Sequence, residues 1–199
     1  MEINPSVITG VVLAGGRGRR MGGGDKGLMC WRGRPLVSYA LAALEGVAET
    51  RLINANRNLG DYAAFGFPVV ADAKKNFDGP LAGLLSAMRA AATPYVLIIP
   101  CDVPLMNSVL LHRLTVHLAA ADAVVAVAQD GERLQPLLML VETRLADDLQ
   151  AFLDSGERKV EHWIRRHRWI SVDFSDIPLA LANINTPEDL ARLDAVGRP

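Results

Sequence analysis

The sequence has almost no net charge, very little cysteine and no long apolar run. Its formal net charge at pH 7 is -1, so no overall positive field would draw it to nucleic acid or to an anionic membrane. No apolar stretch reaches the roughly 18 residues that a membrane-spanning helix requires. The two cysteines, Cys30 and Cys101, show no CxxC spacing and no neighbouring histidine, which argues against a zinc site. We therefore expect neither a nucleic-acid partner nor a membrane partner, and we expect any bound anion to be held by a local cluster of groups.

The ends and the overall composition point to an ordinary cytoplasmic protein. Residues 1–6 carry one acid and no basic residue, unlike a secretory signal, and two isolated thiols suit a reducing compartment. The chain has 199 residues, of which 50% are hydrophobic and 22% are charged. These values are typical of one globular domain, which we expect to span residues 1–199 as a monomer.

Apolar periodicity predicts strands that alternate with helices along the whole chain. Strands are expected at residues 9–14, 51–55, 68–71, 95–99, 123–128 and 137–141, with an edge strand at 169–174. Helices are expected at residues 35–47, 81–92, 105–119, 144–153 and 160–166, and a last helix opens at Thr186-Pro187. The strand at 137–141 follows a short turn, so it is expected to run antiparallel. This pattern predicts an α/β fold of three layers, with a doubly wound, mostly parallel sheet, helices on both faces, and ligands at the carboxyl ends of the strands.

The first predicted strand is followed by a loop that is rich in both glycine and cations. Residues 13–27 read LAGGRGRRMGGGDKG and contain Arg17, Arg19, Arg20 and Lys26. Glycine lets backbone N–H groups approach a ligand closely, and several fixed cations suit a polyphosphate. The loop lacks the Gly-Lys-Ser/Thr ending of a P-loop. It also lacks the G-x-G-x-x-G fingerprint of dinucleotide-binding folds, which argues against a nicotinamide-dependent oxidoreductase. A solvated loop that is basic by chance is the alternative.

An acidic residue follows the strongly apolar strand at 95–99. Asp102 lies just past this strand, at the same edge of the sheet as the glycine-rich loop. Mg²⁺ usually binds one or two carboxylates together with substrate phosphates and water, and Asp102 fits that pattern. A cap on the following helix, before Leu105, is the alternative interpretation. The adjacent Cys101 is interpreted as a small packing residue.

These motifs resemble those of a known family. The run LAGG-x-G-x-R-M-G…DKG looks like the signature loop of nucleotidyltransferases that activate sugars or pterins, which share a nucleotide-diphospho-sugar-transferase-like fold. Sugar-activating members usually have Pro-Lys where this chain has Asp25-Lys26. The Met-Gly…Asp-Lys-Gly version is similar to the molybdenum cofactor guanylyltransferases, although Gly18 stands where many relatives have Ala or Ser. The resemblance covers nearly the whole chain.

The resemblance implies a set of nucleotide-contacting residues in the first half, roughly residues 8–104. It implies catalytic roles for Arg20, Lys26 and Asp102, with Asp102 holding Mg²⁺ or, as an alternative ion, Mn²⁺. The implied GTP contacts are Leu13, Ala14, Gly15, Gly16, Lys26, Asn54, Asp72, Gly79, Pro80, Leu81 and Asp102. From the residues alone, Asn54 also reads as a turn residue, Asp72 as a turn cap and residues 79–83 as a tight loop into a helix.

The second half, roughly residues 105–199, is implied to bind the acceptor. By resemblance, Arg158 and Lys159 hold the phosphate of the pterin, and Asn183 and Asn185 contact the pterin itself; a solvated helix start and a turn are the plain alternatives. The basic run at 165–168 is too short, on a chain without net charge, to indicate nucleic-acid binding. The four histidines are scattered and are given no chemical role.

The expected reaction is therefore transfer of GMP from GTP to molybdenum-molybdopterin, with release of pyrophosphate. The rivals within enzymes are a cytidylyltransferase acting on the same pterin and a sugar-phosphate nucleotidyltransferase. A rival of another class is a non-catalytic chaperone that binds the pterin. Besides the two substrates, the resemblance implies contacts with other molybdenum cofactor biosynthesis proteins and with molybdoenzyme chaperones.

Overall fold

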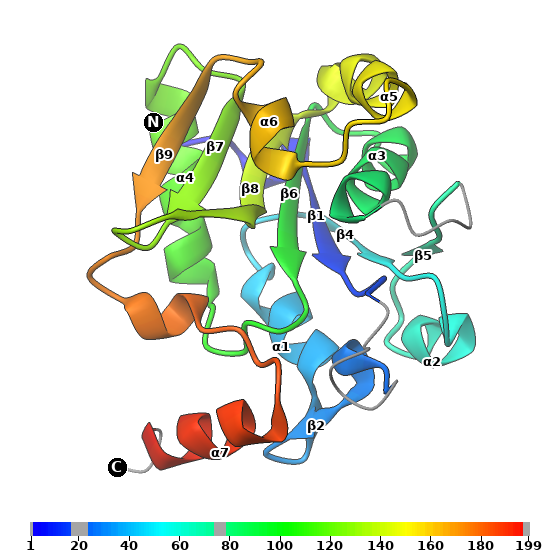
Figure 1. Ribbon diagram of the computed structural model, residues 1–199, viewed down its shortest axis with the longest axis vertical. Helices are drawn as coiled ribbons and strands as arrows, with labels where there is room; N and C mark the ends of the chain where they lie inside the picture. Colours follow the sequence, from blue (N-terminus) through cyan, green and yellow to red (C-terminus); the bar gives the residue numbers. More distant parts are fainter. Residues whose placement is uncertain (1, 17–23, 74–78, 197–199) are drawn as a thin grey trace.

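The computed structural model describes residues 2–16, 24–73 and 79–196. A seven-stranded sheet runs through the middle of the molecule in the order β5-β4-β1-β6-β8-β7-β9 (Figure 1). The strands are β1 (Ile8–Leu13), β4 (Thr50–Asn54), β5 (Val69–Val70), β6 (Tyr95–Pro100), β7 (Val125–Gln129), β8 (Leu134–Glu142) and β9 (Trp169–Asp173). All neighbouring pairs are parallel except those made by β8, which is antiparallel to both β6 and β7. The predicted antiparallel strand and the predicted edge strand are both confirmed.

Helices cover both faces of this sheet, as predicted. The helices are α1 (Leu36–Ala43), α2 (Leu59–Ala63), α3 (Pro80–Ala90), α4 (Ser108–Ala120), α5 (Ala146–Asp154), α6 (Val160–Ile164) and α7 (Pro187–Val196). α1 and α4 contribute to one hydrophobic cluster, and α3, α5 and α6 contribute to another on the opposite face. The helices in the described ranges are all too short or too polar to span a bilayer.

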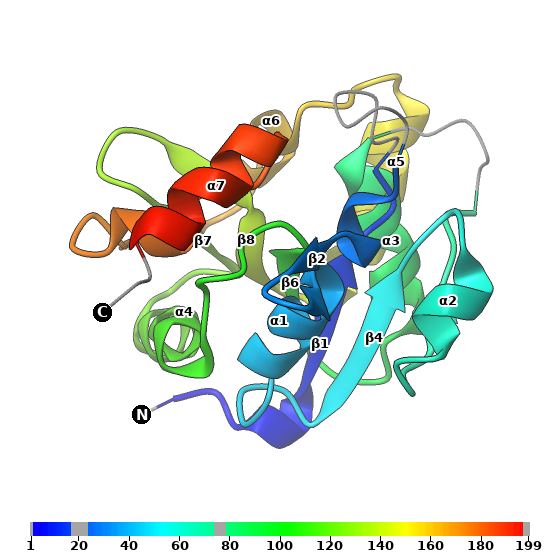
Figure 2. The ribbon, with the colours of Figure 1, turned by 90° about the horizontal axis from the view of Figure 1, so that it is seen from below.

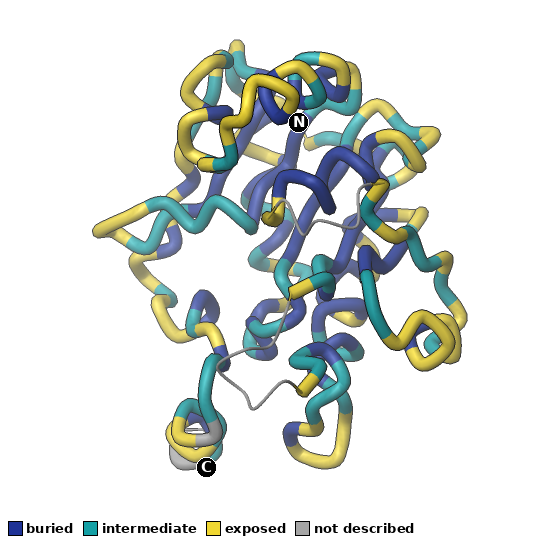
Figure 3. The backbone as a smooth tube through the Cα atoms, turned by 45° about the vertical axis from the view of Figure 1, so that its right-hand side comes forward, coloured by how far each residue is buried: buried dark blue, intermediate teal, exposed yellow. Residues whose placement is uncertain are grey.

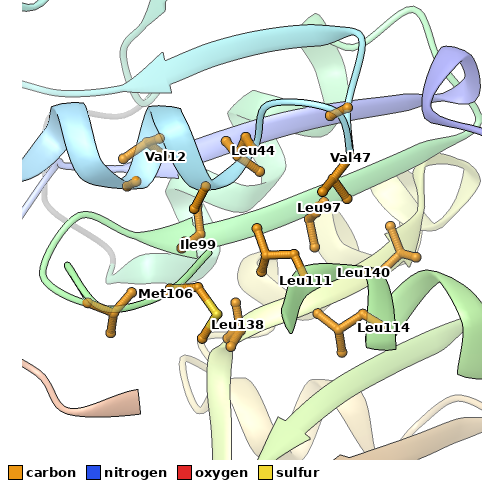
Figure 4. Packing of buried hydrophobic residues seen from close by; sticks show 14 of the residues in the cluster. Val12, Leu44, Val47, Leu97, Ile99, Met106, Leu111, Leu114, Leu138 and Leu140 are labelled. Carbon is orange, nitrogen blue, oxygen red and sulfur yellow. The ribbon is translucent and has the colours of Figure 1, made fainter. Parts of the chain in front are cut away.

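Alternating side chains of the central strands fill these two clusters. Val12 and Ile99 point to the face covered by α1 and α4, and Figure 4 shows them in the same cluster as Leu111 and Leu138. Val11 and Ile98 point to the other face. A strand buried on both faces reads as a continuous apolar run, which is why the sequence reveals β1 and β6 so clearly. Figure 3 shows buried residues along these central strands and mainly exposed residues in the outer loops.

Element ends differ from the sequence predictions where a polar residue or a glycine ends the regular backbone. The helix expected from residue 105 starts at Ser108, because the Asn107 side chain accepts a hydrogen bond from Leu110 N at 3.1 Å. The helix expected to reach residue 47 ends at Ala43, shortly before Gly46 with its positive φ of 77°. Thr186 caps α7 as predicted, since its hydroxyl accepts from Asp189 N.

A small hairpin and the last helix form a separate cluster below the sheet. The hairpin consists of β2 (Cys30–Trp31) and β3 (Arg34–Pro35), and sequence periodicity did not predict it. Its Trp31 packs with Ile184 and Leu193 of the C-terminal segment. The indole N–H of Trp31 also donates to Asp194 Oδ1 at 2.8 Å. Seen from the carboxyl ends of the parallel strands, α7 and α2 lie on opposite sides of the hairpin (Figure 2).

Candidate active site

Three side chains from distant parts of the chain meet at the carboxyl edge of the sheet. Lys26 begins a short 3₁₀ helix, Asp102 lies two residues beyond β6, and Asn185 immediately precedes Thr186. Lys26 Nζ donates to Asp102 Oδ2 at 2.7 Å and to Asn185 Oδ1 at 2.8 Å. The side chains of Lys26 and Asp102 are 21% and 15% exposed, so solvent and ligands can still reach them.

The backbone holds this meeting point together. Asp102 O accepts a hydrogen bond from Ile184 N at 2.9 Å, which ties the segment before α7 to the end of β6. β6 pairs with β8 only from Tyr95 to Ile98, so its last residues continue toward Asp102 beyond that pairing. The interpretation of Asp102 as a helix cap is wrong, because the next helix starts at Ser108 and takes its cap from Asn107.

One oxygen of Asp102 fits a metal ion. Asp102 Oδ1 is buried and has no hydrogen-bond partner among the described residues, although a buried carboxylate oxygen normally has one. A hard cation such as Mg²⁺ would satisfy this oxygen. The described residues contain no group of three or more acidic, histidine or cysteine side chains that could hold a metal, so the other ligands would be phosphate oxygens and water. Burial raises the pKa of the neighbouring Cys101 thiol well above its usual value, which supports its interpretation as a packing residue.

The start of the glycine-rich loop is held between two strand ends. Leu13 O accepts from Cys101 N at 3.2 Å, and Ala14 N donates to Asn54 O at 2.8 Å. Gly16 O accepts from Arg57 Nη2 at 3.2 Å. Arg57 was not predicted as a site residue, although it is the one cation in the short run 55–58 that follows β4. The predicted catalytic Arg20, together with Arg17 and Arg19, lies outside the described residues.

A polar network closes the ends of β4 and β5. Asn54 is the last residue of β4 and only 2% exposed, so its interpretation as a turn residue is wrong. Its Nδ2 donates to Asp72 Oδ1 at 2.9 Å and to Val70 O at 3.1 Å. Asn56 Nδ2 donates to Asp72 Oδ2 at 2.8 Å, and Asp72 N donates back to Asn56 Oδ1 at 2.8 Å. Both carboxylate oxygens of Asp72 are thus already hydrogen-bonded within the protein.

Two glycines let this network pack closely against its neighbours. A methyl group added at Gly15 would lie 2.9 Å from Asn56 Nδ2 and 3.3 Å from Asn54 Oδ1. A methyl group added at Gly83, within α3, would overlap Asn54 Oδ1. The contact of Gly83 with Asn54 could not be predicted from the sequence, because a glycine inside a helix does not indicate which residue lies opposite it.

The predicted segment 79–81 forms the entry to α3. Gly79 has a φ of 84°, a conformation that favours glycine, and Pro80 takes the first helical position. Leu81 is 1% exposed and belongs to the core. This arrangement agrees with a tight loop into a helix, and it leaves any nucleotide contact to the backbone and to Pro80.

The four predicted acceptor residues do not form one cluster. Asn185 contacts Lys26, whereas the neighbouring Asn183 is exposed beside a hollow of about 190 Å³ between the preceding loop and α7. Arg158 Nη1 donates to Leu153 O and Glu157 O, both at 2.7 Å, which places its guanidinium at the end of α5. Lys159 is exposed and immediately precedes α6.

Comparisons with known proteins show which family the chain resembles. The family model of the MobA-like NTP transferase domain matches residues 10–170. A molybdenum cofactor guanylyltransferase from Shewanella halifaxensis is 45% identical over 186 residues, which cover 94% of this chain and 93% of that protein. Among solved structures, molybdopterin-guanine dinucleotide biosynthesis protein A from Archaeoglobus fulgidus is similar with a TM-score of 0.78 and 22% identity, covering 94% of this chain and 97% of that one.

A further structural neighbour is named for nucleotidyl transfer to another substrate. It is the 2-C-methyl-D-erythritol 4-phosphate cytidylyltransferase from Thermus thermophilus, with a TM-score of 0.72 and 17% identity over 100% of both chains. At this identity the likeness concerns the fold alone. The family model and the relative at 45% identity establish that the chain belongs to the molybdenum cofactor guanylyltransferases, a family with the MobA-like NTP transferase domain.

Proposed function

We propose that this protein transfers GMP from GTP to molybdenum-molybdopterin, which yields molybdopterin guanine dinucleotide cofactor and pyrophosphate. The observation that carries the proposal is the contact of Lys26 with Asp102 at the carboxyl edge of the sheet, 2.7 Å apart, where α/β folds bind nucleotides. The relative at 45% identity is a molybdenum cofactor guanylyltransferase, which supports the choice of GMP and of the molybdenum cofactor.

The reaction needs positioning and charge neutralisation more than proton transfer. The acceptor phosphate oxygen is already anionic at neutral pH, so it can attack the α-phosphorus in line without a strong general base. Lys26 would neutralise negative charge on the triphosphate, together with Arg20. Such fixed cations act by electrostatic stabilisation of the charge that moves toward the leaving pyrophosphate.

Asp102 is the residue that would hold the metal ion. Mg²⁺, or Mn²⁺ in its place, supplies charge neutralisation at the phosphates when it is bound. Asp102 Oδ1 has no hydrogen-bond partner among the described residues, while Oδ2 accepts from Lys26. One carboxylate would therefore position both positive charges that the triphosphate requires.

The remaining predicted residues divide between the two substrates. We assign the backbone of residues 13–16, together with Asn54 and the Asp72 that supports it, to the nucleotide, and residues 79–81 to its base. Arg158, Lys159, Asn183 and Asn185 lie in the half of the chain, residues 105–199, that we assign to the pterin. Asn185 reaches from that half to Lys26, which would place the acceptor next to the phosphates.

The cellular setting is proposed on similar grounds. Cys30 is an exposed free thiol and Cys101 is a buried one, which suits a reducing cytoplasm. We propose a monomer that exchanges the molybdenum cofactor with other biosynthesis proteins and with molybdoenzyme chaperones.

A nucleotide panel tests the proposed reaction. The protein is mixed with molybdenum-loaded pterin, Mg²⁺ and one of the four NTPs, and both pyrophosphate and the dinucleotide product are measured. We expect turnover with GTP and at least about 100-fold slower turnover with CTP, because a polar base-binding site rejects the wrong base strongly. Faster product formation with CTP would make the protein a cytidylyltransferase. Pterin binding without pyrophosphate release from any NTP would make it a chaperone.

A further inference from the structure

The residues on either side of Lys26 contact the same buried tyrosine. Tyr62 belongs to the five-residue helix α2 and has no exposed surface. Its hydroxyl donates a hydrogen bond to Asp25 Oδ1. A methyl group added at Gly27 would overlap that same hydroxyl, so the backbone of Gly27 packs directly against it.

Asp25 receives two further hydrogen bonds that fix its carboxylate. Asn58 Nδ2 donates to Asp25 Oδ2 at 2.9 Å, and Gly27 N donates to Asp25 Oδ1 at 3.3 Å. Burial and the hydrogen bond to Asp25 raise the pKa of Tyr62 far above its usual value, so the hydroxyl stays protonated and remains a donor at physiological pH. These contacts hold the polypeptide immediately before and after Lys26.

The side chain of Lys26 makes its own hydrogen bonds to other parts of the chain. It reaches Asp102 and Asn185, while Asp25 and Gly27 face α2. α2 and α7 lie on opposite sides of the segment in both ribbon views (Figures 1 and 2). A lysine side chain is long and flexible, so the place where its ammonium group settles depends on how firmly its backbone is held.

We propose that Tyr62 is a positioning residue for nucleotide transfer, which acts through Asp25 and Gly27 to hold the Lys26 backbone where its ammonium group meets the triphosphate. This inference rests on the proposed function of the Lys26 site. A role of Tyr62 in core packing alone would need only the aromatic ring. The proposed role needs the hydroxyl, and Tyr62→Phe removes the hydroxyl while keeping the ring.

The first experiment follows the backbone and needs no nucleotide. Amide hydrogen exchange is measured by mass spectrometry on a peptide covering residues 24–30, in which Leu28 N donates to Asp25 O and Met29 N donates to Lys26 O. Tyr62→Phe is expected to speed this exchange about ten-fold, because the segment loses a hydrogen bond to a charged group. Asn58→Gly removes the second side-chain donor to Asp25 and keeps the positive φ of 50° accessible, so it should act in the same direction. Unchanged exchange in both variants would overturn the proposal.

The second experiment tests whether Tyr62 acts through Lys26. GTP affinity in the presence of Mg²⁺ is measured by calorimetry for the wild type, Tyr62→Phe, Lys26→Met and the double variant. We expect Tyr62→Phe to weaken binding about five-fold when Lys26 is present and to have no further effect when it is absent. An equal weakening in both backgrounds would mean that the hydroxyl does not act through Lys26, and it would overturn the proposal.

Thr9→Val is the matched control for loss of a buried hydroxyl. The Thr9 hydroxyl bonds the Thr93 hydroxyl at 2.7 Å, at the opposite end of β1 from the site. This variant should lose stability with unchanged exchange at residues 24–30 and unchanged GTP affinity. If the wild type itself binds no GTP, the proposed function fails, while the exchange measurement still decides whether Tyr62 holds the Lys26 backbone.

Discussion

Two aspartates at the same edge of the sheet have opposite surroundings. Asp72, beyond β5, has an amide donor on each carboxylate oxygen, one from Asn54 and one from Asn56. Asp102, beyond β6, has Lys26 on one oxygen and no described partner on the other. A position at the end of a strand therefore does not by itself make a carboxylate a metal ligand. Its unused hydrogen-bonding capacity decides whether it can bind a metal, and we expect Asp72 to act mainly as support.

The largest expected effect is at Asp102. Asp102→Ala should lower turnover at least about 1000-fold, because the metal site and one partner of Lys26 are lost together. Its melting temperature should change little, since Lys26 is partly exposed and keeps Asn185. Pyrophosphate release and thermal unfolding are the measurements, with Asp122→Ala as the control, because Asp122 lies in an exposed ion pair with Arg168. Turnover close to wild type in the presence of Mg²⁺ would remove Asp102 from the metal site.

The next effect is at the cation beside it. Lys26→Met should weaken GTP binding by about 100-fold in calorimetry, because charge-assisted contacts to the triphosphate are lost. Lys159→Met removes the same charge from the acceptor half and should leave GTP affinity unchanged. Equal losses in the two variants would contradict the division of the chain between nucleotide and pterin.

Asp72 should respond in stability more than in chemistry. Asp72→Ala removes the carboxylate that accepts from Asn54 and Asn56, which leaves the almost fully buried Asn54 amide with Val70 O as its acceptor. We expect a loss of about 2–3 kcal/mol in the free energy of unfolding, measured with urea. Asp147→Ala, at an exposed position on α5, should cost less than about 0.5 kcal/mol. If Asp72→Ala is stable but has lost turnover, Asp72 acts in the reaction and not mainly as structural support.

The smallest expected effect concerns the glycine that packs against Asn54. Gly83→Ala places a methyl group against the buried Asn54 Oδ1 and should destabilise the protein by about 1–2 kcal/mol. Gly60→Ala is the matched control, since Gly60 lies in helix α2 with open space around it. That change should be neutral or stabilising, because alanine favours helices over glycine. Similar unfolding curves for both variants would show that the network around Asn54 tolerates displacement.

Much of the fold could be predicted from the sequence, because strands buried on both faces leave continuous apolar runs. β1 and β6 are of this kind, and the glycine-rich loop and Asp102 follow them directly. The hairpin of β2 and β3 and the short helix α2 were not predicted, because elements of two to five residues are too short to show a period.

Only part of the candidate site could be predicted from the sequence. The carboxyl ends of parallel strands meet at one edge, so Lys26 and Asp102 could be expected near each other. The contact of Asn185 with Lys26 depends on how α7 packs against the hairpin, and long-range packing of this kind leaves no local pattern. The support given by Tyr62 to Asp25 has the same origin, because a tyrosine in a short helix looks like any other core residue.

The bond between Lys26 and Asn185 joins positions that are 159 residues apart. During synthesis, Lys26 therefore emerges from the ribosome long before Asn185 has been added to the chain. Lys26 reaches its final surroundings only when α7 has been synthesised and has packed against Trp31. Nearly the whole chain must fold before this centre is complete, which would keep half-made polypeptides from sequestering GTP.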